Sequence, residues 1–110
     1  MTKFKEGFLV LSLRDGNVEE FNQAARQTET IDLCGANLRG ADLRQANLRK
    51  ADMRGAYCHS ADLRGVDLSQ ASLEGASFHR ARISGAYFPA NVSADEIKIS
   101  LELGTRIRCR

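Results

Sequence analysis

Apolar residues in the central part of the chain recur every five positions. From Ile31 to Ala90 the sequence divides without gaps into twelve blocks of five residues. Ala holds the first position in ten blocks and Leu the third position in seven, whereas the second, fourth and fifth positions are mostly polar. The pattern predicts a backbone that brings the first and third residues of every block to a common interior.

Neither a helix nor a straight strand meets this demand. In an α-helix five residues turn through about 500°, so the leucines would spiral around the cylinder. In a straight strand an odd period of five moves the next Ala to the opposite face. The conflict disappears if the chain turns a corner in each block, and the frequent Gly at the fifth position suits such corners. We therefore predict a coil stacked on itself, a β-solenoid.

The blocks, such as ADLRG and ANLRG, resemble those of the pentapeptide-repeat proteins, whose motif is A(D/N)LXX. The resemblance covers residues 31–90, just over half of the chain. It implies an all-β solenoid, a right-handed quadrilateral β-helix with four blocks in each coil. The twelve blocks would then form about three coils, with residues twenty apart stacked on one another. We expect short helical caps at both ends.

The segments outside the repeat fit the role of caps, because the edges of a solenoid invite pairing with other chains. We expect a helical N-terminal cap in residues 1–30, the repeat in 31–90, and a C-terminal helix followed by a basic tail in 91–110. Asn17 and Glu20 predict a helix that begins after residue 17 and ends near residue 26. Residues 6–14 alternate like a strand, but a helix is favoured there because it completes a helical hairpin.

The C-terminal cap raises the question of self-association. Ser93 and Glu96 form a capping-box pattern that predicts a helix over residues 94–103, although IKISLEL also alternates as a strand does. In a helix, Ile99 and Leu103 lie roughly opposite the side that covers the coil. We therefore expect these two residues to be exposed, as candidate contacts of a homodimer.

Length and composition limit the remaining possibilities. A chain of 110 residues is expected to form one domain, and its net charge of +2 does not by itself indicate nucleic-acid binding. Three widely spaced cysteines favour free thiols in a reducing compartment. The sequence contains neither an apolar run of membrane-spanning length nor a signal-peptide pattern, so we expect a cytoplasmic protein.

The sequence lacks the standard signatures of catalysis. It contains no GxGxxG, Walker loop, HExxH or CxxC motif, and no nucleophile lies at a known spacing from a base. We predict no enzyme activity and no cofactor.

Sorting the outward positions by face, under the four-block register, separates the charges. Three faces mix acids and bases, which is typical of a solvated surface of Asp–Arg neighbours. The blocks 36–40, 56–60 and 76–80, called the second face below, contain no carboxylate. Their outward residues, the candidate docking residues, are Asn37, Arg39, Tyr57, His59, Ser60, Ser77, His79 and Arg80.

The second face is expected to be positive, and more so below about pH 6.5, where histidines become charged. We interpret it as a docking face for an acidic protein surface. The alternative is that one of four short faces lacks carboxylates by chance. His59 and His79 should stack about 4.8 Å apart. Two imidazoles are too few for a closed zinc site, and no metal site is predicted.

Taken together, the sequence favours a non-catalytic module that presents flat faces to a protein partner. Some members of the family resemble duplex DNA in size and negative charge and act on DNA gyrase. That role is the alternative here, disfavoured because the repeat carries eight basic against six acidic residues. Direct nucleic-acid binding lacks an aromatic stacking platform beyond Tyr57 and Tyr87.

Overall fold

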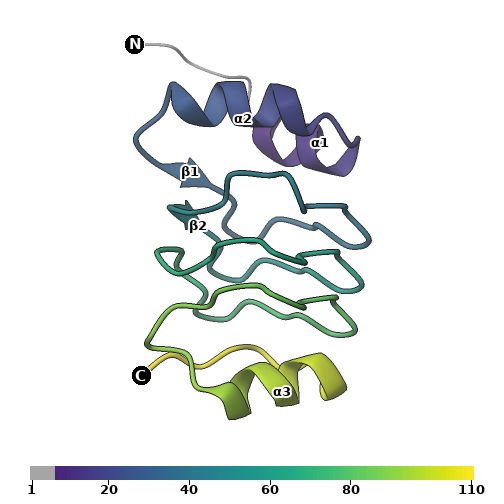
Figure 1. The fold of residues 1–110 in the computed structure, drawn as a ribbon, viewed down its shortest axis with the longest axis vertical. Coiled ribbons are helices and arrows are strands. Elements are labelled where there is room, and N and C mark those ends of the chain that lie inside the picture. Colours follow the sequence, from purple (N-terminus) through teal and green to yellow (C-terminus); the bar gives the residue numbers. More distant parts are fainter. Residues whose placement is uncertain (1–6) are drawn as a thin grey trace.

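A computed structural model of the chain describes residues 7–110, which form a stack of coils between two helical ends (Figure 1). The first residues of the expected N-terminal cap, 1–6, lie outside the described residues. Helices α1 (Phe8–Arg14) and α2 (Val18–Arg26) lie together above the first coil. Both helices expected in this region are confirmed, and Leu13 and Phe21 bury their side chains completely.

The turn between these helices explains one correction. Gly16, with φ of 79°, stops α1, and the N–H of Asn17 donates to the carbonyl of Ser12 at 2.8 Å. Asn17 occupies the N-cap of α2, where the helix was expected to begin, but its side chain makes no cap hydrogen bond. Its backbone closes the preceding turn and has a ψ of 60°, which is not the extended conformation that a capping side chain prefers.

In the central part of the chain, residues twenty apart in the sequence lie side by side on successive turns. Strands β1 (Ile31–Asp32) and β2 (Ala51–Asp52) pair in parallel, with Ile31 opposite Ala51. The same spacing recurs in isolated parallel bridges: Asn37–Tyr57, Asp42–Asp62, Asp52–Ser72, Tyr57–Ser77, Asp62–Arg82 and Asp67–Tyr87. Figure 1 shows the successive turns lying on one another. The predicted pairing of residues twenty apart is therefore confirmed.

The expectation of an all-β solenoid between helical caps needs correction in the extent of its strands. Residues 7–110 contain only two strands, each of two residues, and three helices. A turn in successive blocks interrupts the ladder before a longer strand can form. Hydrogen bonds still join the coils, as from the N–H of Leu38 to the carbonyl of Tyr57 at 2.8 Å.

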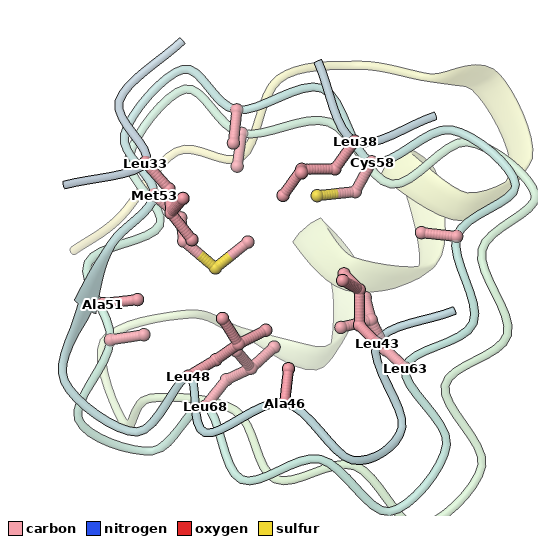
Figure 2. Close-up of a cluster of buried hydrophobic side chains, with 14 of the residues drawn as sticks. Leu33, Leu38, Leu43, Ala46, Leu48, Ala51, Met53, Cys58, Leu63 and Leu68 are labelled. Atoms are coloured by element: carbon pink, nitrogen blue, oxygen red, sulfur yellow. The ribbon is translucent and has the colours of Figure 1, made fainter. Parts of the chain in front are cut away.

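The core consists of the first and third residues of the blocks. Both are buried in all ten blocks from residue 31 to 80. Figure 2 shows Leu33 with Met53, and Leu38 with Cys58, projecting into the shared interior from consecutive coils. In the last two blocks the corresponding residues are only half-buried: Ala81, Ile83, Ala86 and Phe88. Burying one such aliphatic side chain contributes about 1.5–3 kcal/mol, so the repeated Leu is the main source of stability.

The corners explain the Asp or Asn at the second position. Its side-chain oxygen accepts a hydrogen bond from the N–H two residues later, as Asp67 does from Ser69 at 2.9 Å. Seven corners are closed in this way, by Asp32, Asn37, Asp42, Asn47, Asp52, Asp62 and Asp67. The polar second position thus has a structural role before any functional one.

At the N-terminal end, a side chain completes the backbone pairing of the first coil. The amide nitrogen of Asn22 in α2 donates to the carbonyl of Gln45 at 2.9 Å. Its amide oxygen accepts from the N–H of Asn47 at 2.7 Å. One side chain therefore satisfies a donor and an acceptor that a further coil would otherwise pair.

At the C-terminal end, helix α3 (Ala94–Leu103) confirms the predicted helix and excludes the strand alternative. The Ser93 hydroxyl accepts from the N–H of Glu96 at 3.2 Å, which is one half of the expected capping box. Leu101 packs half-buried against the core. Ile99 and Leu103 point away from it, exposed by 38% and 68%.

The basic tail is not a free tail. Residues 105–110 run back along the last coil, with Arg106 bridged antiparallel to Ser77 and the N–H of Ile107 donating to Ala76 at 2.7 Å. Ile107 is completely buried, whereas the arginines on either side of it are exposed. None of the helices in residues 7–110 is long and apolar enough to span a membrane.

Candidate partner-docking face

The second face is built on a ladder that crosses all coils. Tyr57 bridges to Asn37 on one side and to Ser77 on the other, and Ser77 bridges in turn to Arg106. The N–H of Tyr57 donates to Ala36, and that of Ser77 to Ala56, at 2.8 and 3.0 Å. The buried first and third residues fix the backbone, so the outward side chains are held at a constant spacing.

Three rings gather at the centre of this face. Tyr57 stacks on His59, with ring centroids 3.6 Å apart and an interplanar angle of 26°. The rings of His59 and His79 lie 5.3 Å apart at 47°, so the predicted proximity of the histidines is confirmed while their stacking is not. Both imidazoles are half-buried.

Ser77 corrects the predicted set of docking residues, because it is only 6% exposed. Its hydroxyl donates to the carbonyl of Gly104 at 2.9 Å and lies 2.8 Å from Nε2 of His59. The C-terminal cap has closed over this rung of the ladder. Ser77 is therefore part of the support of the face and is not available to a partner.

The same contacts determine how the His59–Ser77 pair is hydrogen bonded. A serine hydroxyl carries one proton, and here it is committed to Gly104. His59 must then donate from Nε2, and the lone pair of its neutral ring lies on Nδ1. This is the reverse of a nucleophilic pair, in which the imidazole accepts the serine proton. The arrangement holds the ring and the cap in place.

The electrostatics of His59 correct a second expectation. Burial lowers its pKa below the ordinary value of 6.5, and the neighbouring charges of His79 and Arg39 lower it further. His59 therefore gains its charge at lower pH than the sequence suggested. The face remains positive at neutral pH through its arginines.

Two corners of this face have an unusual backbone. Ser60 and Arg80 have φ of 61° and 58°, and they are the only non-glycine residues with positive φ in residues 7–110. Both are fifth-position residues and both are exposed. Ser60 donates its N–H to His79 at 2.8 Å, and Arg80 donates its N–H to Leu101 at 3.0 Å. A left-handed conformation costs a residue with a Cβ about 1–2 kcal/mol.

The structure adds Arg106 to the face. It continues the ladder beyond Ser77, and its side chain is exposed and donates to the carbonyl of Gly75 at 3.2 Å. The alternation of apolar and charged residues in TRIRCR was a signal for this strand-like segment, but nothing in it indicates which face the segment joins. The other predicted residues Asn37, Arg39, Tyr57, Ser60 and Arg80 are exposed on the face as expected.

The neighbouring third face, formed by blocks 41–45, 61–65 and 81–85, has a different chemistry. Arg44 and Arg64 each make a two-pronged ion pair with the Asp two residues earlier, at 2.7–2.9 Å. The hydrogen bond from Arg44 lowers the pKa of Asp42 to about 2. These charges are satisfied within the chain. In contrast, no ion pair in residues 7–110 involves Arg39 or Arg80.

Other parts of the surface are weaker candidates for a functional site. A depression of about 420 Å³ is lined by Thr30, Asp32, Cys34, Lys50, Asp52, Arg54 and Ser72. Hydrogen bonding to Asp52 raises the pKa of the exposed Cys34 thiol, which disfavours the reactive thiolate. Within the described residues no three His, Cys, Asp or Glu side chains gather as a metal site would require.

Comparison with protein families identifies the repeat. The model of pentapeptide repeats matches residues 31–57 and 56–88, with eight copies of the repeat. The matched region is the stack of coils described above and covers more than half of the chain. No curated protein matches the chain significantly.

Proposed function

Because the chain belongs to the pentapeptide-repeat family, we propose that it is a non-catalytic module that binds a protein partner through its second face. Proteins of this family are typically structural or binding modules. The repeating core supports this role, because it presents outward side chains at fixed positions without requiring a pocket. We also propose that the coils form the right-handed quadrilateral β-helix that the family implies, a shape favoured by the register of twenty residues.

The observation that carries the proposal is the backbone at Ser60 and Arg80. At all other left-handed positions in residues 7–110 the chain has Gly, which adopts this conformation without strain. The two exceptions lie on the one face without carboxylates. Residues in strained conformations tend to cluster at functional sites, where another requirement outweighs their cost. A contact made by these two side chains is such a requirement.

The charge of the face indicates the kind of partner. Arg39 and Arg80 are exposed and make no ion pair in residues 7–110, and Arg106 extends the same surface. A protein surface rich in Asp and Glu complements this arrangement. Ser77 is buried and His79 is half-buried, so the expected contacts come mainly from Arg39, Tyr57 and Arg80.

The test is a comparison of bound proteins between matched variants. The native chain, an Arg39→Gln/Arg80→Gly variant and an Arg44→Gln/Arg64→Gln control are used to capture proteins from the cells that produce the chain. Each control arginine lies on the third face. A partner identified by mass spectrometry is then purified and its affinity is measured by calorimetry.

We expect a loss of affinity of at least tenfold for the second-face variant and little change for the control. Unequal folding is checked by thermal unfolding, and the second-face variant should be at least as stable as the native chain. Equal affinity of all three proteins for the partner would refute the proposed face.

A second proposal concerns the homodimer expected at the C-terminal cap. Ile99 and Leu103 form an exposed apolar pair one helical turn apart on α3. If two copies pair their α3 helices antiparallel, Ile99 of one copy meets Leu103 of the other. The same symmetry brings the exposed Lys98 of one copy close to Glu102 of the other, which is a complementary pair of charges. We propose a second copy of this chain as the occupant of this surface.

Light scattering over a range of concentrations tests the dimer. The native chain should double its mass as the concentration rises, and Leu103→Glu should remain a monomer. Lys98→Glu should also weaken the dimer, and Lys98→Glu/Glu102→Lys should restore it by exchanging the two charges. A native chain that stays monomeric at the highest concentration would exclude this proposal.

A further inference from the structure

His59 lies at the centre of the second face, and every neighbouring element contributes to its surroundings. Arg39 comes from the coil before it, Tyr57 stacks on its ring, and His79 comes from the coil after it. The C-terminal segment closes over Ser77, the hydrogen-bond partner of His59, and places Arg106 opposite Ser77 on the ladder. The charged or titratable groups around His59 are thus basic or aromatic.

We propose that the second face binds an acidic protein segment in a proton-linked manner, with His59 taking up a proton as a carboxylate of the partner docks beside Arg39. This inference rests on the proposed function, because it assigns the chemistry and the regulation of the same face. It requires that a defined nitrogen of His59 can accept the proton without loss of the existing hydrogen bonds.

The hydrogen bonds meet this requirement. Since the Ser77 proton is given to Gly104, His59 donates from Nε2, and Nδ1 remains as the nitrogen that can be protonated. Protonation at Nδ1 leaves the Nε2–Ser77 contact unchanged, so the C-terminal cap stays in place. The face of Tyr57, 3.6 Å away, favours a cationic ring over a neutral one.

The surroundings of His59 disfavour its charge while the face is empty. Burial and the charges of His79 and Arg39 lower its pKa, as described above. A carboxylate within about 4–6 Å reverses the balance, and an opposite charge at such a distance shifts a pKa by about 1–3 units. The pKa of His59 is then higher in the complex than in the free chain. Binding therefore becomes tighter as pH falls through the interval between these two values.

An acidic protein segment fits this face better than a nucleic acid. Aspartate carboxylates have a pKa near 3.9, so they are ionised at about pH 5.5 and above. Single-stranded nucleic acids are bound through free aromatic faces. Tyr57, the single Tyr, Phe or Trp among the outward residues of this face, already has His59 stacked on it.

Fluorescence anisotropy with a labelled short polyaspartate peptide tests the proposal at constant ionic strength. The native chain should bind the peptide at least about fivefold more tightly at about pH 5.5 than at about pH 7.5. Uptake of one proton can change the binding constant by at most about tenfold per pH unit. His59→Gln retains a donor for Ser77 but cannot be protonated. It should keep the affinity found at about pH 7.5 and lose most of the increase.

Three further variants and one further probe make the result specific. His79→Gln should reduce the pH dependence less than His59→Gln, and Arg39→Gln should weaken binding at every pH. The Arg64→Gln control on the third face should behave as the native chain. A single-stranded oligonucleotide of similar charge should bind more weakly than polyaspartate. Tighter binding of the oligonucleotide, or an unchanged pH dependence in His59→Gln, would overturn the proposal.

Nuclear magnetic resonance provides a direct measurement, because the chain contains only two histidines and His79→Gln leaves one. The pKa of His59 should rise when the peptide is added. If the peptide binds to the second face and the pKa of His59 does not rise, the proposed proton linkage is wrong while the proposed docking face stands. Arg39→Gln and Arg80→Gly are measured with the same peptide, and if neither weakens its binding, both the inference and the proposed function fail.

Discussion

The second and third faces lie side by side on the same coils, yet they treat charge and backbone in opposite ways. On the third face Asp42 and Asp62 close the corners and neutralise the arginines two residues later. On the second face the corresponding positions are Asn37, Tyr57 and Ser77, and the arginines have no such partners. The comparison teaches that the same buried core supports corners that satisfy their charges within the chain and corners that do not.

The largest expected effect tests whether the two faces share one core. Leu38 lies behind the second face and Leu43 behind the third, and both are completely buried. Replacing either by Ala removes buried methyl groups and leaves a cavity, which should lower the free energy of unfolding by about 2–5 kcal/mol. Urea unfolding should give similar losses for both. A loss confined to one variant would mean that the faces are not equivalent in packing.

The next effect tests how far the second face depends on the C-terminal cap. Gly104 and Gly65 have the same φ of 75°, so Ala causes the same backbone strain at both. At Gly104 an added Cβ would lie 2.8 Å from Nδ1 of His79, whereas at Gly65 nothing lies within 4 Å. Gly65→Ala should cost about 1–2 kcal/mol. Gly104→Ala should cost clearly more, since overpacking adds about 1–3 kcal/mol.

Thermal unfolding of the two variants, with His79→Ala/Gly104→Ala as a third, separates strain from collision. Removing the imidazole should bring the cost at Gly104 close to that at Gly65. If both single variants lose the same stability, the cap does not press on the second face as the structure indicates.

These differences also show what the sequence could and could not predict. The inward Ala and Leu positions and the register of four blocks followed from the period of five and the family resemblance, because one residue type repeats at each buried position. The helices at both ends followed from the turn at Gly16 and the cap at Ser93. Contacts between separate segments were not predictable, since no local pattern indicates that Asn22 reaches Gln45 or that the final residues return to the ladder.

The same limit applies to the docking face. The absence of carboxylates in the second-face blocks is visible in the sequence. The burial of Ser77 beneath Gly104, and the lowered pKa of His59, depend on where the C-terminal cap lies. The positive φ of Ser60 and Arg80 could not be predicted from their position in the block. Gln45, Lys50 and Gln70 are also at fifth positions and do not have a positive φ.

A smaller effect tests the backbone strain at these corners, by whether a substitution to Gly raises or lowers the stability of the chain. Arg80→Gly and Ser60→Gly should each stabilise the chain by about 1 kcal/mol, because Gly tolerates the left-handed backbone and keeps the N–H donor. On the third face Gln45 has no positive φ, and Gln45→Gly should instead destabilise by about 0.5–1 kcal/mol. Chemical denaturation measures all three. A stabilising Gln45→Gly, or a destabilising Arg80→Gly, would remove the contrast on which the docking face rests.

The smallest effect concerns the charges of the third face. The pKa of Asp42 is about 2 in the folded chain, below the value near 3.9 of an unfolded Asp. A lowered pKa contributes stability that is present above about pH 4 and is lost as pH falls toward about 2. Asp42→Asn keeps the acceptor that closes the corner, as Asn37 does on the second face, but removes the charge. Melting temperatures of the native chain and this variant should differ slightly at neutral pH and converge below about pH 3, while Asn37→Ala should shift the melting temperature equally across this range. A difference between the native chain and Asp42→Asn that persists unchanged to about pH 2 would assign the role of Asp42 to its shape rather than its charge.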